Sequence, residues 1–174
     1  MRDQHRLALA LAAVLASLLC SGCGSSDTPG STAHANGSAA TATKAQFIAQ
    51  AERICSALAT DERPLKARQE SLKGLPVASA EAAFVSLVHQ VIALSHTAAS
   101  KLGALPRPAQ DAAAIEKLLS SFAEETGDAK SIADAASRQE STAGEAAEDA
   151  LRRSVAKNRV LAAEYGMKDC IGSE

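Results

Sequence analysis

The sequence predicts an all-α fold, an up-down antiparallel four-helix bundle closed by one disulfide. Three observations favour it. The composition is rich in Ala, Leu, Glu and Ser, which is typical of helical proteins. From residue 43 onward, apolar side chains recur three, four or seven positions apart, as on one face of a helix. Glycine and proline separate these stretches by only a few residues, and short connections favour antiparallel neighbours.

The first predicted helix begins near Thr43. Pro64 lies within it and predicts a kink or a break. Residues 74–76, Gly-Leu-Pro, end the stretch. The apolar positions expected on its inner face are Phe47, Ala51, Ile54, Leu58, Leu65 and Leu72.

The second helix has the most regular pattern and is expected to start at Ser79, whose side chain can cap it. Pro106 and Pro108 close it, and Pro108 suits the first turn of the next helix, where its missing N–H costs nothing. Its inner seam alternates at steps of four and three: Phe84, Val88, Val91, Ser95, Ala98, Leu102 and Leu105.

The third helix should direct Ile115, Leu118, Leu119 and Phe122 inward and end at Gly127, with Asp128 capping the next helix. Residues 128–165 then form either one long helix or two helices separated by the polar residues 139–144. Gly166 is a natural C-terminal cap in both cases. The inward positions of this last part keep a near-heptad spacing: Ala129, Ile132, Ala136, Ala143, Ala147, Leu151, Val155, Asn158, Ala162 and Tyr165.

The N-terminus has the layout of a signal peptide. Arg2 and Arg6 precede an uncharged run over residues 7–19. Because a membrane-spanning helix needs roughly 20 residues, this run is too short to be a stable span. Residues 21–23, Ser-Gly-Cys, come directly after Cys20 and resemble the lipobox of bacterial lipoproteins, although Cys20 stands where that family usually has leucine.

The lipobox resemblance implies cleavage after residue 22 and a lipid on Cys23, with acyl chains such as palmitate. The protein would then be extracytoplasmic and anchored to the cell membrane by that lipid. Ordinary signal cleavage with a free secreted product is the alternative. Residues 1–22 are thus a predicted signal peptide, 23–42 the lipidated cysteine and a Gly/Ser/Thr-rich flexible linker, and 43–174 the bundle domain.

Two cysteines remain after cleavage, Cys55 and Cys170. An even pair in an oxidising compartment predicts a disulfide. An up-down bundle also brings the end of its last helix beside its first. The alternative is a redox or metal pair, but neither Cys55 nor Cys170 belongs to a CxxC motif, and no histidine is near either of them in the sequence.

Three short segments carry a second resemblance: residues 51–57 (AERICSA), 102–108 (LGALPRP) and 165–172 (YGMKDCIG). They resemble a group of uncharacterised extracytoplasmic helical proteins of high-GC Gram-positive bacteria that have a cysteine pair. The resemblance spans roughly residues 43–172. It implies the same pairing and fold, and it brings no activity with it.

Composition and motifs argue against several functions. A formal net charge of −2 gives no basic field for nucleic acid, and three Phe, one Tyr and no Trp leave little for stacking on sugars or bases. The sequence has no Gly-rich phosphate loop, HExxH or GxSxG, and its SxxK stretch at residues 154–157 is not accompanied by the SDN and KTG motifs of serine acylases. Acidic residues are expected on helix surfaces, with pairs such as Glu62–Lys66, Asp134–Arg138, Glu148–Arg152 and Asp149–Arg153. We therefore expect no enzyme and no cofactor.

His89 and His96 are the weak candidates for a metal site. They lie two turns apart, about 10 Å along a helix, so one ion cannot contact both. We expect both at the edge of the core.

The sequence leaves three hypotheses for function. The first is a membrane-anchored, non-catalytic module that binds a protein partner or a small ligand. The second is a structural or envelope-stress protein without a ligand. The third is a metal or cofactor carrier using His89 or His96.

Overall fold

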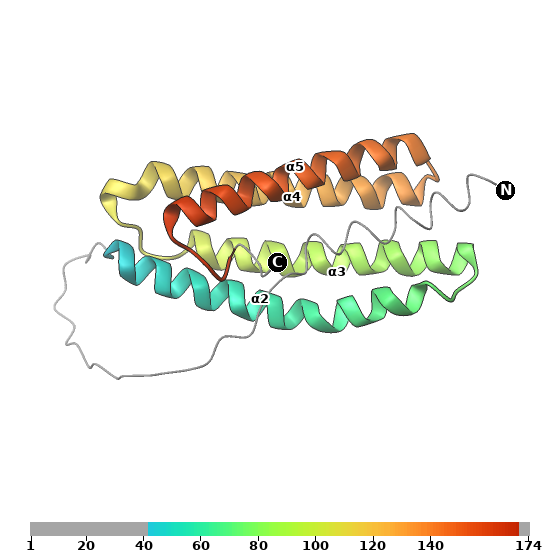
Figure 1. Cartoon of the computed structure of the whole chain (residues 1–174), viewed down its shortest axis with the longest axis horizontal. Helices are drawn as coiled ribbons and strands as arrows, with labels where there is room; N and C mark the ends of the chain where they lie inside the picture. Colours follow the sequence, from blue (N-terminus) through green and yellow to red (C-terminus); the bar gives the residue numbers. More distant parts are fainter. Residues whose placement is uncertain (1–41, 171–174) are drawn as a thin grey trace.

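The four-helix prediction is confirmed by the computed structural model, which describes residues 42–170. The helices are α2 (Lys44–Leu72), α3 (Val77–Gly103), α4 (Ala112–Ser137) and α5 (Ser141–Tyr165), and the turn η1 (Ala109–Asp111) precedes α4. The described residues contain no strand. Each helix runs antiparallel to the next, with α2 and α3 in one layer and α4 and α5 in the other (Figure 1).

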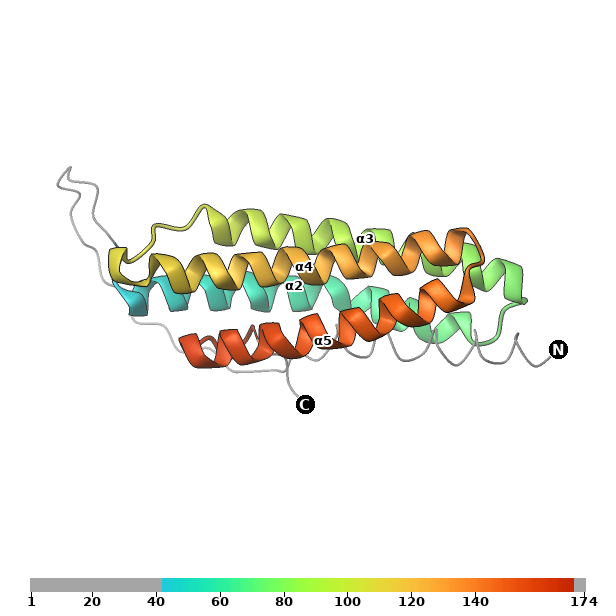
Figure 2. The same cartoon turned by 90° about the horizontal axis from the view of Figure 1, so that it is seen from above.

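The helices pack in chain order, α2 on α3, α3 on α4 and α4 on α5. All four run along the long axis of the molecule when it is seen from above (Figure 2). Residues 1–41 lie outside the described part of the chain. They hold the predicted signal peptide, Cys23 and nearly all of the predicted linker.

Helix α2 begins with a capping box. The side chain of Thr43 accepts a hydrogen bond from the Gln46 N–H at 3.2 Å, and the Gln46 side chain accepts one from the Thr43 N–H at 2.9 Å. The expected break at Pro64 is wrong, because α2 continues to Leu72 and only curves along its length (Figure 1). Pro64 faces solvent, where water can satisfy the carbonyl it leaves unpaired, and buried Leu65 keeps the following turn on the core.

Helix α3 starts two residues before the expected Ser79. Its N-cap is Pro76, whose carbonyl accepts the N–H groups of Ser79 and Ala80, so the Ser79 side chain does not cap it. The seam is confirmed at its centre, where Phe84, Val88 and Val91 are buried. By length and composition alone, α3 is apolar enough to cross a membrane. A core helix meets the same test, and α3 packs between α2 and α4.

Helix α4 passes through Gly127 and ends at Ser137, so the expected break at Gly127 with a cap at Asp128 is wrong. An exposed glycine costs a helix only about 1 kcal/mol relative to alanine. Burial of Ala129, Ile132 and Ala133 in the next two turns outweighs this cost. The same result settles the open question about residues 128–165. They are divided between α4 and α5 by the residues 138–140.

Two hydrophobic clusters fill the bundle. The first is formed mainly by Phe84 and Val91 of α3 with Ile132 of α4 and Leu151 of α5. The second lies near the other end and joins α2 to the C-terminal segment. In it, the rings of Phe47 and Tyr165 meet edge to face at 5.7 Å, and the Tyr165 hydroxyl donates to Asp111 at 3.0 Å.

The C-terminal segment folds back on α2 directly after α5. Gly166 ends the helix in the left-handed conformation, with φ of 100°, and confirms the predicted cap. Met167 is then fully buried, and the Lys168 N–H donates to the side chain of Glu52 at 3.1 Å. These contacts bring Cys170 to Cys55, and the two form the predicted disulfide with their Cα atoms 5.1 Å apart.

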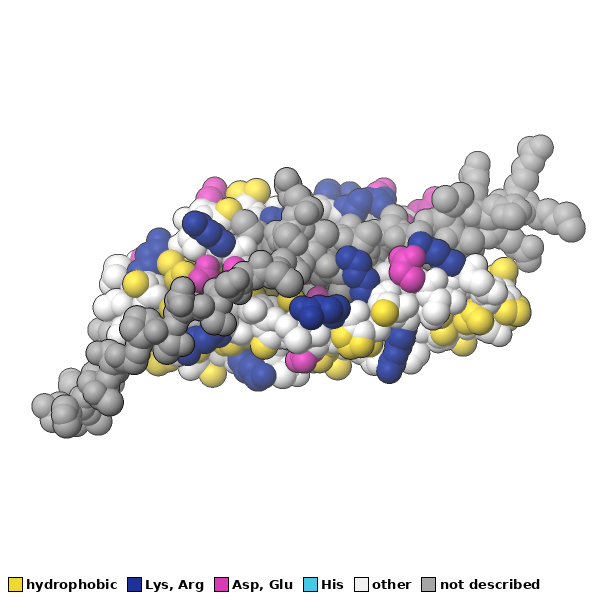
Figure 3. Space-filling model, turned by 60° about the horizontal axis from the view of Figure 1, so that its bottom comes forward, with side chains coloured by type: hydrophobic (Ala, Val, Ile, Leu, Met, Phe, Trp, Pro, Cys, Tyr) yellow, Lys and Arg dark blue, Asp and Glu magenta, His cyan; other side chains and the backbone are white. Residues whose placement is uncertain are grey.

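The surface carries mixed charge. On the face in Figure 3, Lys and Arg side chains are scattered among acidic and uncharged ones. Hydrophobic side chains gather at the end of the molecule where α2 turns into α3 (Figure 3), and Leu75 and Val77 there are each 45% exposed. The described surface thus agrees with the expectation of no basic field.

Candidate functional site

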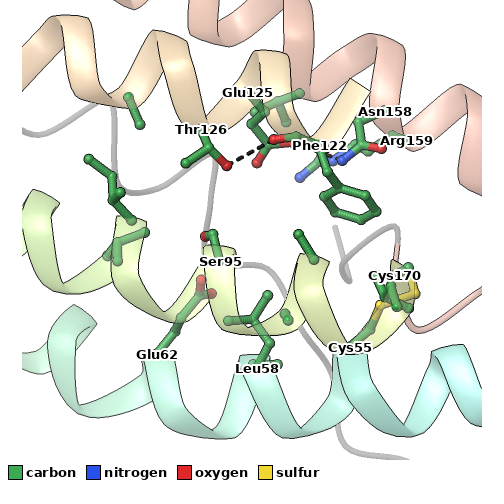
Figure 4. Close-up of a pocket in the computed structure, with 18 of the residues that line it drawn as sticks. Cys55, Leu58, Glu62, Ser95, Phe122, Glu125, Thr126, Asn158, Arg159 and Cys170 are labelled. Carbon is green, nitrogen blue, oxygen red and sulfur yellow. Dashed lines mark hydrogen bonds between the residues drawn. A yellow bond between two sulfur atoms is a disulfide. The ribbon is translucent and has the colours of Figure 1, made fainter. Parts of the chain in front are cut away.

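A cavity of about 90 Å³ lies in the interior of the bundle, between the two helix layers. All four helices line it, and the C-terminal segment adds Asp169 and Cys170 (Figure 4). Its apolar wall includes Leu58, Val91, Ile92, Leu102, Phe122 and Val155. Several polar side chains share this space, so the cavity is more than a packing gap.

Glu62 is the first of these polar groups. Its side chain points from α2 toward the cavity, and the residue is only 5% exposed (Figure 4). Burial, and secondarily the nearby carboxyl group of Glu125, raise the pKa of Glu62 to about 8. The surface position expected for Glu62 beside Lys66 is therefore wrong.

The register of α2 explains why Glu62 is buried. Buried Cys55 lies seven residues before Glu62 and buried Leu65 lies three residues after it. These are the spacings of one helix face, so Glu62 occupies a core position although its side chain is acidic. In the sequence, the apolar positions of this face skip from Leu58 to Leu65. The acidic residue at the helical position between them was the signal that could have predicted a buried carboxyl group.

Glu125 approaches the same cavity from α4 (Figure 4). Burial raises its pKa, and the charge of Asp128 acts in the same direction. The hydrogen bond from Asn158 and the positive charge of Arg159 lower it in part. The expectation that acidic residues lie on helix surfaces is therefore wrong for a second residue, which keeps the helical register of Ile115 and Leu118.

Asn158, on α5, is 5% exposed, as its predicted inward position requires. Its Nδ2 donates to Glu125 Oε2 at 2.8 Å. The amide nitrogen thus faces Glu125, whose carboxyl oxygen accepts. The amide oxygen, Oδ1, has no hydrogen-bond partner among the described residues. A buried acceptor without a partner costs about 1–3 kcal/mol.

The charged groups around the cavity do not balance. Glu62, Glu125 and Asp169 are acidic, and Arg159 is the basic residue in the described cavity wall. Helix α3 contributes Ser95 and apolar side chains to this wall. The wall would therefore carry more negative than positive charge once all three acids ionise.

The residues predicted as sites fall in different places. Cys55 and Cys170 meet, and their disulfide forms one edge of the cavity. His89 and His96 are exposed on α3 and do not line it. Within residues 42–170, no group of three or more His, Cys, Asp or Glu side chains could hold a metal ion. Cys23 lies outside the described residues.

Exposed ion pairs lie along the helices as expected, although their hydrogen-bonded partners differ from those predicted. Asp149 pairs with Arg152, and Asp134 pairs with Lys130 at 2.6 Å. The Lys130 hydrogen bond lowers the pKa of Asp134. Such exposed pairs contribute at most about 1 kcal/mol each, so they mark the solvated face and not a site.

No protein-family model matches the chain, and no curated protein or solved structure matches it significantly.

Proposed function

We propose that this protein is a lipid-anchored, extracytoplasmic binding module that holds a small ligand in the cavity between its four helices, without catalysing a reaction. The observation that carries the proposal is the combination of a cavity with buried polar groups. Buried Glu62 and Asn158 and partly buried Glu125 all line it.

A bundle that only needed to be stable would gain from apolar side chains at these positions. Burial of a carboxyl group disfavours its charged form, and an unpaired acceptor adds a further cost. In other bundles, ligand sites are likewise built in the core from side chains on facing helices. A ligand that donates hydrogen bonds to these groups would offset their cost.

The anchor in this proposal rests on the leader sequence. The basic residues, the short apolar run and the Ser-Gly-Cys ending before the linker support export and a lipid on Cys23. A flexible tether of about 19 residues would extend roughly 25 Å on average and hold the domain near the membrane surface.

Native mass spectrometry of the protein extracted gently from its own membranes tests both parts. An acylated N-terminus at Cys23 supports the anchor, and a reproducible non-covalent mass supports the binding function. Ser95→Leu, which fills the cavity from α3, should lose that mass. Ser100→Leu on the exposed side of the same helix is the matched control and should keep it.

Other results would favour the other hypotheses. A chain that never retains a ligand while its anchor is intact would refute the binding function and favour a structural or envelope-stress role. A retained metal ion would favour a carrier. An unmodified N-terminus in a secreted product would refute the anchor alone.

A further inference from the structure

The polar groups of the cavity define the kind of ligand that would complete it. Arg159 offsets part of the negative charge of Glu125, and its positive charge lowers the pKa of that carboxyl group. The pKa of Glu62 is raised by burial and by the carboxyl group of Glu125, and no cation of the described residues counteracts these two effects. When Glu62 ionises, its negative charge is therefore not offset in the way that of Glu125 is.

Hydrogen bonding adds an independent requirement. Asn158 Oδ1 is buried and has no partner among the described residues, and it can only accept. The carboxyl groups of Glu62 and Glu125 face the cavity (Figure 4), and a carboxylate can only accept, so the group that completes the site must donate. A quaternary ammonium supplies charge without a donor, and a neutral alcohol supplies a donor without charge.

We propose that the cavity binds a small primary ammonium ion with a short apolar body, and that Glu62 releases its proton to solvent when this ligand binds. The inference rests on the proposed binding function and names its ligand class. The ammonium group would donate to the carboxylates of Glu62 and Glu125. Leu58, Ile92 and Phe122 would contact the apolar body.

The size of the cavity limits the ligand. At about 90 Å³ it is smaller than the roughly 150 Å³ cavity that accommodates benzene in another protein. A short alkyl chain suits this space, and its end can extend into the open side of the cavity. A bare metal ion is a poorer occupant, because the described cavity wall lacks the three ligands of a metal site.

Protons balance in this binding step. Without ligand, Glu62 is a neutral carboxylic acid at pH 7, since its pKa is raised to about 8. When the ammonium ion binds, the carboxyl proton passes to bulk buffer and the remaining carboxylate neutralises the ligand. Glu125 and Asp128 from α4, Arg159 from α5 and Asp169 from the C-terminal segment are the other charged groups around this position.

Isothermal titration of the full mature chain with n-butylammonium tests the inference. The titration is run at pH 7 in phosphate and in MOPS, which are free of primary amines and differ in ionisation heat. We expect saturable binding with release of about 0.9 proton per ligand, set by a pKa of about 8. Affinity should rise about tenfold between pH 6 and pH 7 and level off above pH 8.

Variants and probes separate the contributions. Glu62→Gln should abolish the proton release and weaken binding at least tenfold, and its melting temperature shows whether it is folded. Glu70→Gln, on the exposed face of the same helix, should change neither the proton release nor the affinity. Tetramethylammonium and butan-1-ol should each bind at least tenfold more weakly than n-butylammonium.

The two proposals fail in different ways. A native ligand retained in mass spectrometry, together with no binding of n-butylammonium, would overturn the ammonium inference and leave the binding function standing. Binding without proton release, or unchanged in Glu62→Gln, would also overturn it. Failure to retain any native ligand and to bind the amine would overturn both.

Discussion

The buried carboxyl group of Glu62 gives the protein an unusual dependence of stability on pH, and Glu62→Gln tests it directly. Glutamine has the size and shape of the neutral carboxylic acid but cannot ionise. At pH 5, where the Glu62 side chain is protonated in the folded protein, the two proteins should have similar free energies of unfolding. At higher pH the variant should be the more stable one.

The sign and size follow from the pKa. Folding raises the pKa of Glu62 from its ordinary value of 4.5 to about 8, so the folded state holds the proton more tightly. The resulting stabilisation is complete below about pH 4.5 and is lost as the pH rises to about 8. At 1.36 kcal/mol per pKa unit, the loss is about 3 kcal/mol by pH 7 and about 5 kcal/mol in total.

Urea unfolding of both proteins at pH 5 and pH 8, with the disulfide intact, measures this difference. Glu125, whose pKa is raised in the same direction, is present in both proteins and does not account for the difference between them. Glu70→Gln serves as the exposed control and should follow the wild type at both values. If the wild type and Glu62→Gln lose stability in parallel between pH 5 and pH 8, Glu62 is not buried as described.

Further predictions concern the Cys55–Cys170 disulfide, two glycines and the lipid anchor. Cys55→Ser should lower the free energy of unfolding by about 5 kcal/mol in urea, because the disulfide closes a loop of 115 residues; an unchanged value would contradict this account. Gly127→Ala should raise the free energy of unfolding by about 0.5–1 kcal/mol, and with it the melting temperature, since nothing lies within 4 Å of the new methyl group. Gly166→Ala should lower the free energy of unfolding by about 1–2 kcal/mol, because φ is positive at residue 166. Equal signs for the two glycines would refute this reasoning. Cys23→Ser should move the protein from the membrane fraction to the medium on immunoblots, and retention in the membrane would exclude a lipid anchor at that residue.

Much of the fold could be predicted because the apolar periodicity and the helix ends are local properties. The seam at Phe84, Val88 and Val91 and the cap at Gly166 follow from side-chain spacing and backbone sterics. The errors at Pro64 and Gly127 have one cause. Both residues weaken an isolated helix, but the buried residues that come after each of them hold the helix to the core, and that gain comes from tertiary packing.

The cavity was the part that sequence reasoning missed. An acid on an apolar helix face is expected to be solvated, because burial of a charge is costly. Glu62 and Glu125 are far apart in the chain, and only the packing of α2 near α4 shows that they share one enclosed space. Asn158 was placed on an inward face correctly, but its role as a partner of Glu125 depends on the same packing.

The disulfide has a consequence for when the cavity exists. Cys170 and the adjacent Asp169 form part of the cavity wall, and this part is synthesised after all four helices. In a reduced chain, buried Met167 and the bond from Lys168 to Glu52 are the described contacts that hold the segment in place. A chain that has not yet formed the Cys55–Cys170 bond would keep the four helices of the cavity wall but would hold its C-terminal part with fewer contacts. Completion of the cavity is therefore linked to oxidation of one cysteine pair.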